Sequence, residues 1–162
     1  IIFTKQKFLT TAHTANIKNE RKQILIIYNI KNTFHKYERL SSKKQMEVLF
    51  KKGNSLMSHP VKLIFIAPPE DYHFALQAMF VVPKRNFKKA HDRNKLKRRM
   101  KEVYRVNKNE LFQSLELSGN KLLLAFLYTG KKKEEYAIIE IAIKTLIKNV
   151  IKRKTPKSRP QE

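Results

Sequence analysis

The chain has 162 residues, a formal net charge of +23 and a sequence pI near 10.3. A charge of this size indicates an anionic partner, in the first place nucleic acid and in the second an anionic membrane surface. There is no cysteine, which excludes disulfides, cysteine-based zinc sites and thiol catalysis. With 41% hydrophobic residues the chain can still bury a core, and we expect one domain with a tail at each end.

The two ends of the chain differ from its middle in composition and in hydrophobic periodicity. Residues 1–33 are rich in Lys, Thr and Asn without a sustained hydrophobic period, which predicts a poorly ordered basic extension. Its longest apolar run, Ile24–Ile30, predicts at most an edge strand or a short helix. That run is far shorter than the about 20 residues needed to span a bilayer, so a transmembrane helix is not predicted here. No small-residue cleavage site follows it, which disfavours a secretory signal. Residues 154–162 are predicted to form a disordered basic tail.

Residues 34–153 are predicted to form the domain. Ser42 as N-cap and Gly53 as a stop delimit a short helix, on which Met46, Leu49 and Phe50 share one face. For Met46 and Phe50 a place in the core and a place on a binding surface are both open.

Three apolar runs, Val61–Ala67, His73–Pro83 and Lys121–Thr129, predict strands. A second amphipathic helix is predicted over Glu134–Lys152, with Ile138, Ile139, Ala142, Leu146 and Val150 as its apolar stripe. The order is helix, two or three strands, basic helix, strand, helix. It predicts an α+β fold, a two-layer sandwich of one mixed sheet of about four strands with helices packed on it.

Half of the residues between Lys84 and Arg105 are Lys or Arg, and this stretch runs from a loop into a helix. Asp92 is predicted to be the helix N-cap. Residues 107–119 are predicted to continue the helix, with a weaker helical pattern. One face of the helix is apolar and is formed by Leu96, Met100, Val103 and Tyr104. The other face is formed by Asn94, Arg98, Lys101 and Arg105. A merely solvated face usually mixes charges of both signs. This face repels itself, which indicates phosphate as its partner.

Catalytic groups are scarce. Aspartate occurs only at Asp71, in a predicted turn, and at Asp92. The five histidines lack metal-ligand spacing, and three glycines are too few for a phosphate-binding loop. His91 beside Asp92 has the chemistry of an acid, but a phosphate contact or simple exposure explains it better. The chain therefore offers no catalytic residue, and a protein-only nuclease is disfavoured.

The basic stretch resembles a known signature. Residues 93–102 (RNKLKRRMKE) are similar to the arginine–asparagine–arginine motif of the bacterial ribonuclease P protein component, with its following basic pairs and acidic residue. Lys95 stands where that motif usually has its second arginine, which keeps the charge but not the guanidinium fork. Residues 81–85 (VVPKR) and 89–90 (KA) match the strand end and loop that precede the motif. The family's opening pattern fits Lys36, Arg39, Leu40, Leu49, Phe50 and Gly53.

The resemblance covers residues 34–153 and implies a fold shared with a ribosomal protein domain. It also implies a left-handed strand–helix–strand crossover through the basic helix, opposite to the usual hand. The implied function is that of a subunit of ribonuclease P, which removes the 5′ leader from precursor tRNA. The implied partners are a catalytic RNA and precursor tRNA, with Mg²⁺ acting mainly through the RNA. No membrane and no small-molecule substrate is expected, and the implied location is cytoplasmic.

Two sets of residues follow from the resemblance. The expected contacts to the catalytic RNA are Lys84, Arg85, Lys89, His91, Arg93, Asn94, Lys95, Lys97, Arg98, Arg99, Lys101 and Arg105. The expected contacts to the leader are Lys36, Arg39, Met46, Phe50 and Phe65. From the residues alone, a general RNA-binding module such as a ribosomal protein remains the alternative.

Overall fold

The computed structural model describes residues 33–69 and 72–153, and a compact unit begins at Phe34. The predicted extension (apart from Thr33), its run Ile24–Ile30 and the predicted C-terminal tail lie outside the described residues. The elements in chain order are η1 (Lys36–Glu38), α2 (Lys43–Lys52), β1 (Asn54–Ser58), β2 (Val61–Ile66), β3 (Leu76–Val81), α3 (Ala90–Ser118), β4 (Leu122–Tyr128) and α4 (Tyr136–Lys152).

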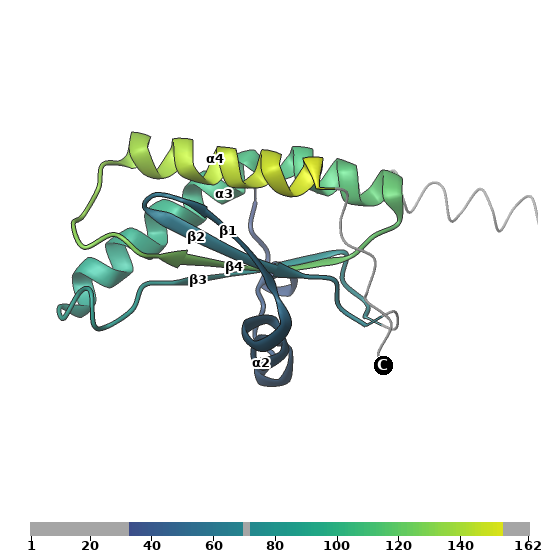
Figure 1. Cartoon of the computed structure of the whole chain (residues 1–162), viewed down its shortest axis with the longest axis horizontal. Coiled ribbons are helices and arrows are strands. Elements are labelled where there is room, and N and C mark those ends of the chain that lie inside the picture. Colours follow the sequence, from purple (N-terminus) through teal and green to yellow (C-terminus); the bar gives the residue numbers. More distant parts are fainter. Residues whose placement is uncertain (1–32, 70–71, 154–162) are drawn as a thin grey trace, which may run out of the picture. The chain divides into compact units, whose positions relative to one another are not determined.

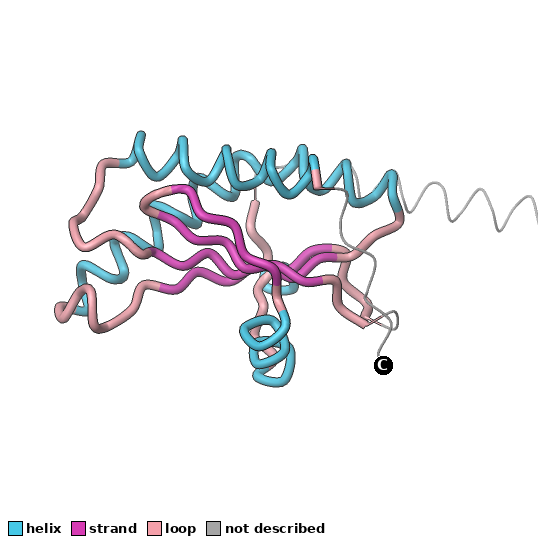
Figure 2. The backbone as a smooth tube through the Cα atoms, viewed as in Figure 1, coloured by secondary structure: helices cyan, strands magenta, loops and turns pink. Residues whose placement is uncertain are grey.

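One mixed sheet with the strand order β1-β2-β4-β3 organises the unit (Figures 1 and 2). The pairs β1–β2 and β2–β4 are antiparallel, while β3 and β4 are parallel and are joined through α3. Figure 1 shows α3 and α4 on one face of the sheet and α2 on the other. The α+β prediction is confirmed, and the short helix α2 places a helix on each face.

The sheet divides its side chains between two cores because successive strand residues point to opposite faces. On the face of α3 and α4, Leu63 and Phe65 of β2 pack with Leu124 and Phe126 of β4. On the face of α2, a smaller core is formed by Leu40, Leu49, Ile64, Leu123 and Ala125. The central strand β4 is therefore buried on both faces, as its continuous apolar sequence predicts.

The structure matches α2 closely and shows why residue 53, which follows it, is glycine. The Ser42 hydroxyl accepts a hydrogen bond from the Gln45 backbone N–H at 3.4 Å, which confirms the predicted N-cap. Gly53 has an ordinary extended backbone, with φ of −69°. A Cβ atom there would lie 2.3 Å from the Leu49 carbonyl oxygen and 2.6 Å from Cγ2 of Ile64. Glycine is thus required for close packing between helix and strand.

Two elements differ from their predictions. The half-exposed sequence NSLMS forms the edge strand β1, which hydrophobic patterning does not predict because three of its five residues are polar. In α4 the predicted stripe is partly wrong, since Ile138 is 40% exposed while Ile143 and Ile147 are buried. The buried stripe is shifted because α4 packs against both α3 and the sheet. In the described part of the chain, no helix is both long and apolar enough to cross a membrane.

A buried ion pair attaches η1 to α3. The Lys108 ammonium contacts the Glu38 carboxylate, and their side chains are 3% and 8% exposed. Beside them, burial and then the Glu38 charge raise the pKa of Tyr104. The chain after η1 continues along the edge of β3, where the Leu40 N–H donates to the Ala78 carbonyl at 3.1 Å. These contacts hold residues 34–40 against α3 and β3.

Candidate RNA interface

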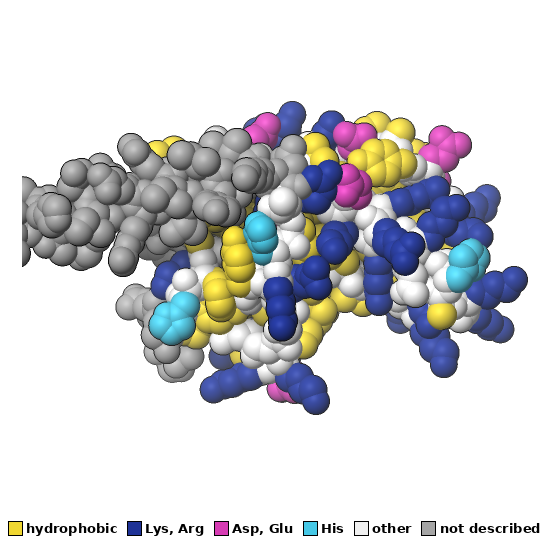
Figure 3. Space-filling view, turned by 180° about the vertical axis from the view of Figure 1, so that it is seen from behind, with side chains coloured by type: hydrophobic (Ala, Val, Ile, Leu, Met, Phe, Trp, Pro, Cys, Tyr) yellow, Lys and Arg dark blue, Asp and Glu magenta, His cyan; other side chains and the backbone are white. Residues whose placement is uncertain are grey.

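The outward face of α3 carries cations that the protein itself does not neutralise. Asn94, Lys95, Lys97 and Arg98 are exposed, whereas the predicted apolar face, Leu96, Met100, Val103 and Tyr104, is fully buried. Within residues 33–69 and 72–153, Lys95, Lys97 and Arg98 make no hydrogen bond or ion pair. Dark blue side chains gather over this part of the molecule in Figure 3. The core fixes one side of the helix, and the other side offers unneutralised positive charge.

Arg93 and Arg99 differ from these exposed cations, because their side chains bind the chain's own backbone. Arg93 Nη1 donates to the carbonyl oxygens of Phe87 at 2.9 Å and Lys88 at 2.6 Å. Arg99 Nη1 donates to the Glu134 carbonyl oxygen at 2.7 Å. Both side chains are half-buried. Arg93 therefore holds the loop before α3, and Arg99 holds the segment that leads into α4.

The prediction that Asp92 caps the helix is wrong. Lys89 is the N-cap and α3 begins at Ala90, so Asp92 lies within the first turn, where a carboxylate still favours the helix dipole. Its Oδ1 atom lies 3.1 Å from Lys133 Nζ and 3.3 Å from His91 Nδ1. The hydrogen bond from Lys133, followed by the charges of His91, Lys133 and Lys89, lowers the pKa of Asp92. Asp92 thus ties the start of α3 to the loop after β4.

The loop from Lys84 to Lys89 is anchored from inside and charged outside. The Asn86 amide donates to the carbonyl oxygens of Thr129 and Gly130, each at 3.3 Å. The ring of Phe87 is buried against Tyr128, with centroids 5.7 Å apart. The predicted RNA contacts of this loop, Lys84, Arg85 and Lys89, are all exposed. They extend the charged face of α3 beyond its N-terminus.

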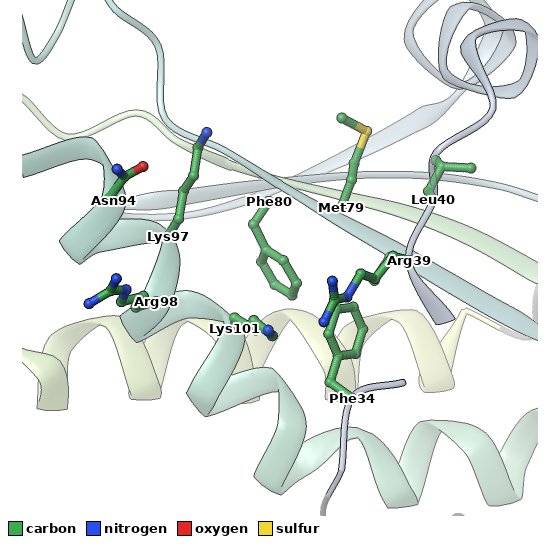
Figure 4. Close-up of a pocket in the computed structure, with 10 residues that line it drawn as sticks. Phe34, Arg39, Leu40, Met79, Phe80, Asn94, Lys97, Arg98 and Lys101 are labelled. Atoms are coloured by element: carbon green, nitrogen blue, oxygen red, sulfur yellow. The ribbon is translucent and has the colours of Figure 1, made fainter. Parts of the chain in front are cut away.

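A hollow of about 420 Å³ lies between α3, β3 and the segment before α2 (Figure 4). Its apolar lining includes Phe34 and Phe80, and its cations are Arg39, Lys97, Arg98 and Lys101. The Lys101 ammonium lies 5.5 Å and the Arg39 guanidinium carbon 5.8 Å from the centroid of the Phe34 ring. Among the described residues that line the hollow, none is acidic.

The hollow brings the two predicted sets together, since Arg39 belongs to the predicted leader contacts and the α3 residues to the predicted contacts with the catalytic RNA. Phe34 and Phe80 are the residues that sequence reasoning missed here. Phe80 lies within a predicted strand, and Phe34 lies at the start of the predicted domain. The sequence does not indicate toward which side of the sheet either ring points.

The other predicted leader residues lie in different environments. Phe50 on α2 is 45% exposed, and Lys36 is exposed as well. Met46 is partly buried against the core beneath α2. The assignment of Phe65 is wrong: it is 1% exposed and points to the opposite face, into the core beneath α3 and α4. On the α2 face its place is taken by the neighbouring side chains of β2, among them the half-buried Lys62.

Arg105 is held by its own helix. Its Nε donates to Glu102 Oε2 at 2.9 Å, so its charge is offset by a neighbouring carboxylate. This pair lowers the pKa of Glu102, chiefly through the hydrogen bond from Arg105. Toward the second half of α3 the helix surface therefore becomes mixed in sign, and the unneutralised face lies over its first three turns.

Comparison with known proteins decides the family. The family model described as Ribonuclease P matches residues 34–150. The chain belongs to the ribonuclease P protein family. It is 33% identical over 129 residues to the ribonuclease P protein component of Chlorobium phaeobacteroides, covering 74% of this chain and 88% of that protein. It is 29% identical over 115 residues to that of Porphyromonas gingivalis, covering 70% and 83%.

Solved structures of the ribonuclease P protein family share the fold. The protein from Thermotoga maritima superposes with a TM-score of 0.52 at 23% identity, covering 69% of this chain and 96% of that one. The Staphylococcus aureus protein gives a TM-score of 0.52 at 17% identity, with coverages of 70% and 94%. The function that follows from the family is that of a ribonuclease P subunit in tRNA processing.

Proposed function

We propose that this chain binds the catalytic RNA of ribonuclease P through α3 and the loop before it, and that the assembled particle removes the 5′ leader from precursor tRNA. The observation that carries the proposal is the row of unneutralised cations on a helix whose other side is fully buried. Such a face lowers its self-repulsion when it meets phosphates. Because its backbone is fixed by the core, little ordering is needed on binding.

The hydrolytic step is assigned to the RNA and its Mg²⁺. Among the described residues, no group of three His, Cys, Asp or Glu side chains is placed to hold a metal ion. We assign no step of the hydrolysis to these residues. The part proposed for the protein is to bind, to orient and to neutralise charge.

The leader is proposed to lie along α2 and η1. Phe50 offers an exposed ring for stacking, and Lys36 and Arg39 offer charges for the phosphates beside it. The leader is a single-stranded part of the substrate, and its unpaired bases can stack on side chains. An exposed ring together with exposed cations suits such a ligand.

Reconstitution tests the proposal. The purified chain is mixed with a bacterial ribonuclease P RNA and precursor tRNA at low Mg²⁺, and release of the 5′ leader is followed. We expect release well above the rate of the RNA alone, with strong salt dependence. A rate no higher than that of the RNA alone would leave only a general RNA-binding module. Cleavage by the protein without any RNA partner would instead show a protein nuclease.

A second measurement tests the leader surface. Phe50→Ala is expected to reduce the preference of the reconstituted enzyme for precursor over mature tRNA, because mature tRNA has no leader to stack. Tyr136→Ala is the matched control, since Tyr136 is an exposed aromatic residue on α4, away from the proposed surface. An equal loss of affinity for both substrates in the Phe50 variant would assign Phe50 to packing or to another RNA contact.

A further inference from the structure

Three aromatic rings stand in a parallel row on the surface, outside both predicted binding sets. The rings of His35 and Tyr37 are stacked, with centroids 5.2 Å apart and planes at 10°. Tyr37 and Phe74 continue the stack at 6.4 Å and 11°. Tyr72 closes the end of the row edge-on, 6.0 Å from Phe74. The row, defined as His35, Tyr37 and Phe74, joins η1 to the segment that leads into β3.

Two members of the row are exposed although they are large and apolar. Tyr37 is 44% and Phe74 40% exposed, whereas five other Phe and Tyr rings in the described part of the chain are buried. Figure 3 shows apolar side chains at the surface between two His side chains, with Lys and Arg close by. The rings of Tyr37 and Phe74 are parallel and partly exposed, so part of their apolar surface is open to a ligand. A row of this kind favours a ligand that stacks.

A buried amide fixes the row from below. Gln77 is 5% exposed, and its Nε2 donates to the Tyr37 carbonyl oxygen at 2.6 Å. Its Oε1 accepts a hydrogen bond from the Tyr72 hydroxyl. One side chain of β3 therefore holds the backbone of the first part of the row and the ring that closes its other end. The platform is preorganised, which lowers the ordering cost of binding.

An exposed cation within the same short segment favours RNA as the ligand of the row. Lys36 lies between the first two rings in sequence and is exposed, while Arg39 of the same segment turns to the hollow at Phe34. Bases stack on aromatic rings while cations hold phosphates, and this combination binds single strands without strong sequence preference. A duplex cannot use the row, because its bases already stack on one another.

We propose that the row stacks unpaired bases of the 5′ leader of precursor tRNA, upstream of those held beside Phe50. The leader is chosen over single strands of the catalytic RNA because Lys36, which lies between the first two rings in sequence, belongs to the proposed leader surface. This inference rests on the proposed function. It adds a second stacking site that is reached only by longer leaders.

A leader-length series tests the inference. Affinities of the reconstituted holoenzyme are measured for precursor tRNAs with leaders of increasing length and for tRNA without a leader, using Tyr37→Leu and Phe74→Leu. Beyond a threshold length, each variant is expected to lose about fivefold or more in affinity, the effect of one lost stacking contact. Shorter leaders and mature tRNA are expected to bind as they do to the unchanged protein. Tyr136→Leu, an equally exposed ring on α4, is the control.

Photocrosslinking with the unchanged protein gives an answer that does not depend on the variants folding. Leaders carrying 4-thiouridine at successive positions are expected to cross-link to peptides containing Tyr37 or Phe74 from positions beyond the threshold length. Two results overturn the inference: losses that are equal for all leader lengths and for mature tRNA, or the absence of cross-links to these peptides from every leader position. Failure of the proposed function looks different, since the unchanged protein would then not stimulate cleavage of any precursor.

Discussion

Alanine variants of Arg93 and Arg98 separate the two roles that arginine plays on α3. Arg98 is exposed and has no hydrogen bond or ion pair within the described part of the chain, so its guanidinium is available to phosphate. A charge-assisted contact to phosphate contributes about 1–3 kcal/mol, which is about 5- to 150-fold in affinity. We expect Arg98→Ala to weaken binding of the catalytic RNA by that factor. Its stability should change by no more than about 0.5 kcal/mol, as for other surface sites.

Arg93 should behave differently because its guanidinium already binds two carbonyl oxygens, at 2.9 and 2.6 Å. Each bond contributes about 0.5–1.5 kcal/mol, so Arg93→Ala should destabilise the fold by about 1–3 kcal/mol, toward the lower end since one of the bonds is exposed. Its effect on RNA affinity should arise mainly from loosening of the loop that carries Lys84, Arg85 and Lys89.

The assay pairs urea unfolding with RNA binding measured over a range of salt concentrations. Loss of one phosphate contact should reduce the salt slope of Arg98→Ala by about 0.7–0.9. Lys148→Ala, an exposed lysine on α4, controls for the loss of one positive charge. The reasoning is refuted if both arginine variants lose affinity equally with no change in stability, or if Arg98→Ala is the less stable of the two.

Three further predictions concern the scaffold. Lys108→Met should lower the free energy of unfolding in urea by about 3–5 kcal/mol, because it leaves the Glu38 carboxylate buried without its partner. Adding Glu38→Gln should recover most of that loss. A loss below about 1 kcal/mol would contradict burial of the pair. Gly53→Ala should destabilise by about 1–3 kcal/mol, measured the same way, because the added methyl group overlaps the atoms that already touch the glycine; no change would show that the helix can move away from β2. The lowered pKa of Asp92 means that its contact with Lys133 stabilises the fold above the unfolded-state pKa, and that this is lost as pH falls through the folded-state value. Asp92→Asn should therefore lower the melting temperature at pH 7 but not at a pH below that value, and a pH-independent difference would refute this.

Features of the fold that depend on the periodicity of apolar residues were predictable from the sequence. Features that depend on which elements pack against each other were not. The apolar face of α3 and the continuous apolar strand β4 were predicted because each pattern has one interpretation. Phe65 was assigned to the wrong face because a strand in which both faces are apolar does not show which face each residue takes. The register with β4 and the position of α2 decide that, and both are tertiary.

The sequence predicted which charged residues form the candidate site. It did not predict which of them bind the chain's own backbone and which remain exposed. Sequence places Arg93, Arg98 and Arg99 in one motif, and nothing in it shows that two of them bind the chain's own carbonyl oxygens. Those carbonyls belong to loops whose paths depend on where β3 and β4 end. The aromatic row was missed for a similar reason, since His35 and Tyr37 are far from Phe74 in sequence and meet only because η1 follows the edge of β3.

The division of the arginines bears on why Lys95 is acceptable in this chain. Arg93 uses one nitrogen, Nη1, to donate to two neighbouring carbonyl oxygens, so its role is to hold the chain's own loop. Lys95 is exposed and makes no such bond within the described residues, so a point charge suffices there if its partner is phosphate. On this argument Lys95→Arg should change RNA affinity little. Arg93→Lys should destabilise the loop less than Arg93→Ala, because one ammonium nitrogen can also donate to two carbonyl oxygens. One motif can therefore serve both the protein's own fold, through Arg93, and the proposed RNA partner, through exposed cations such as Lys95.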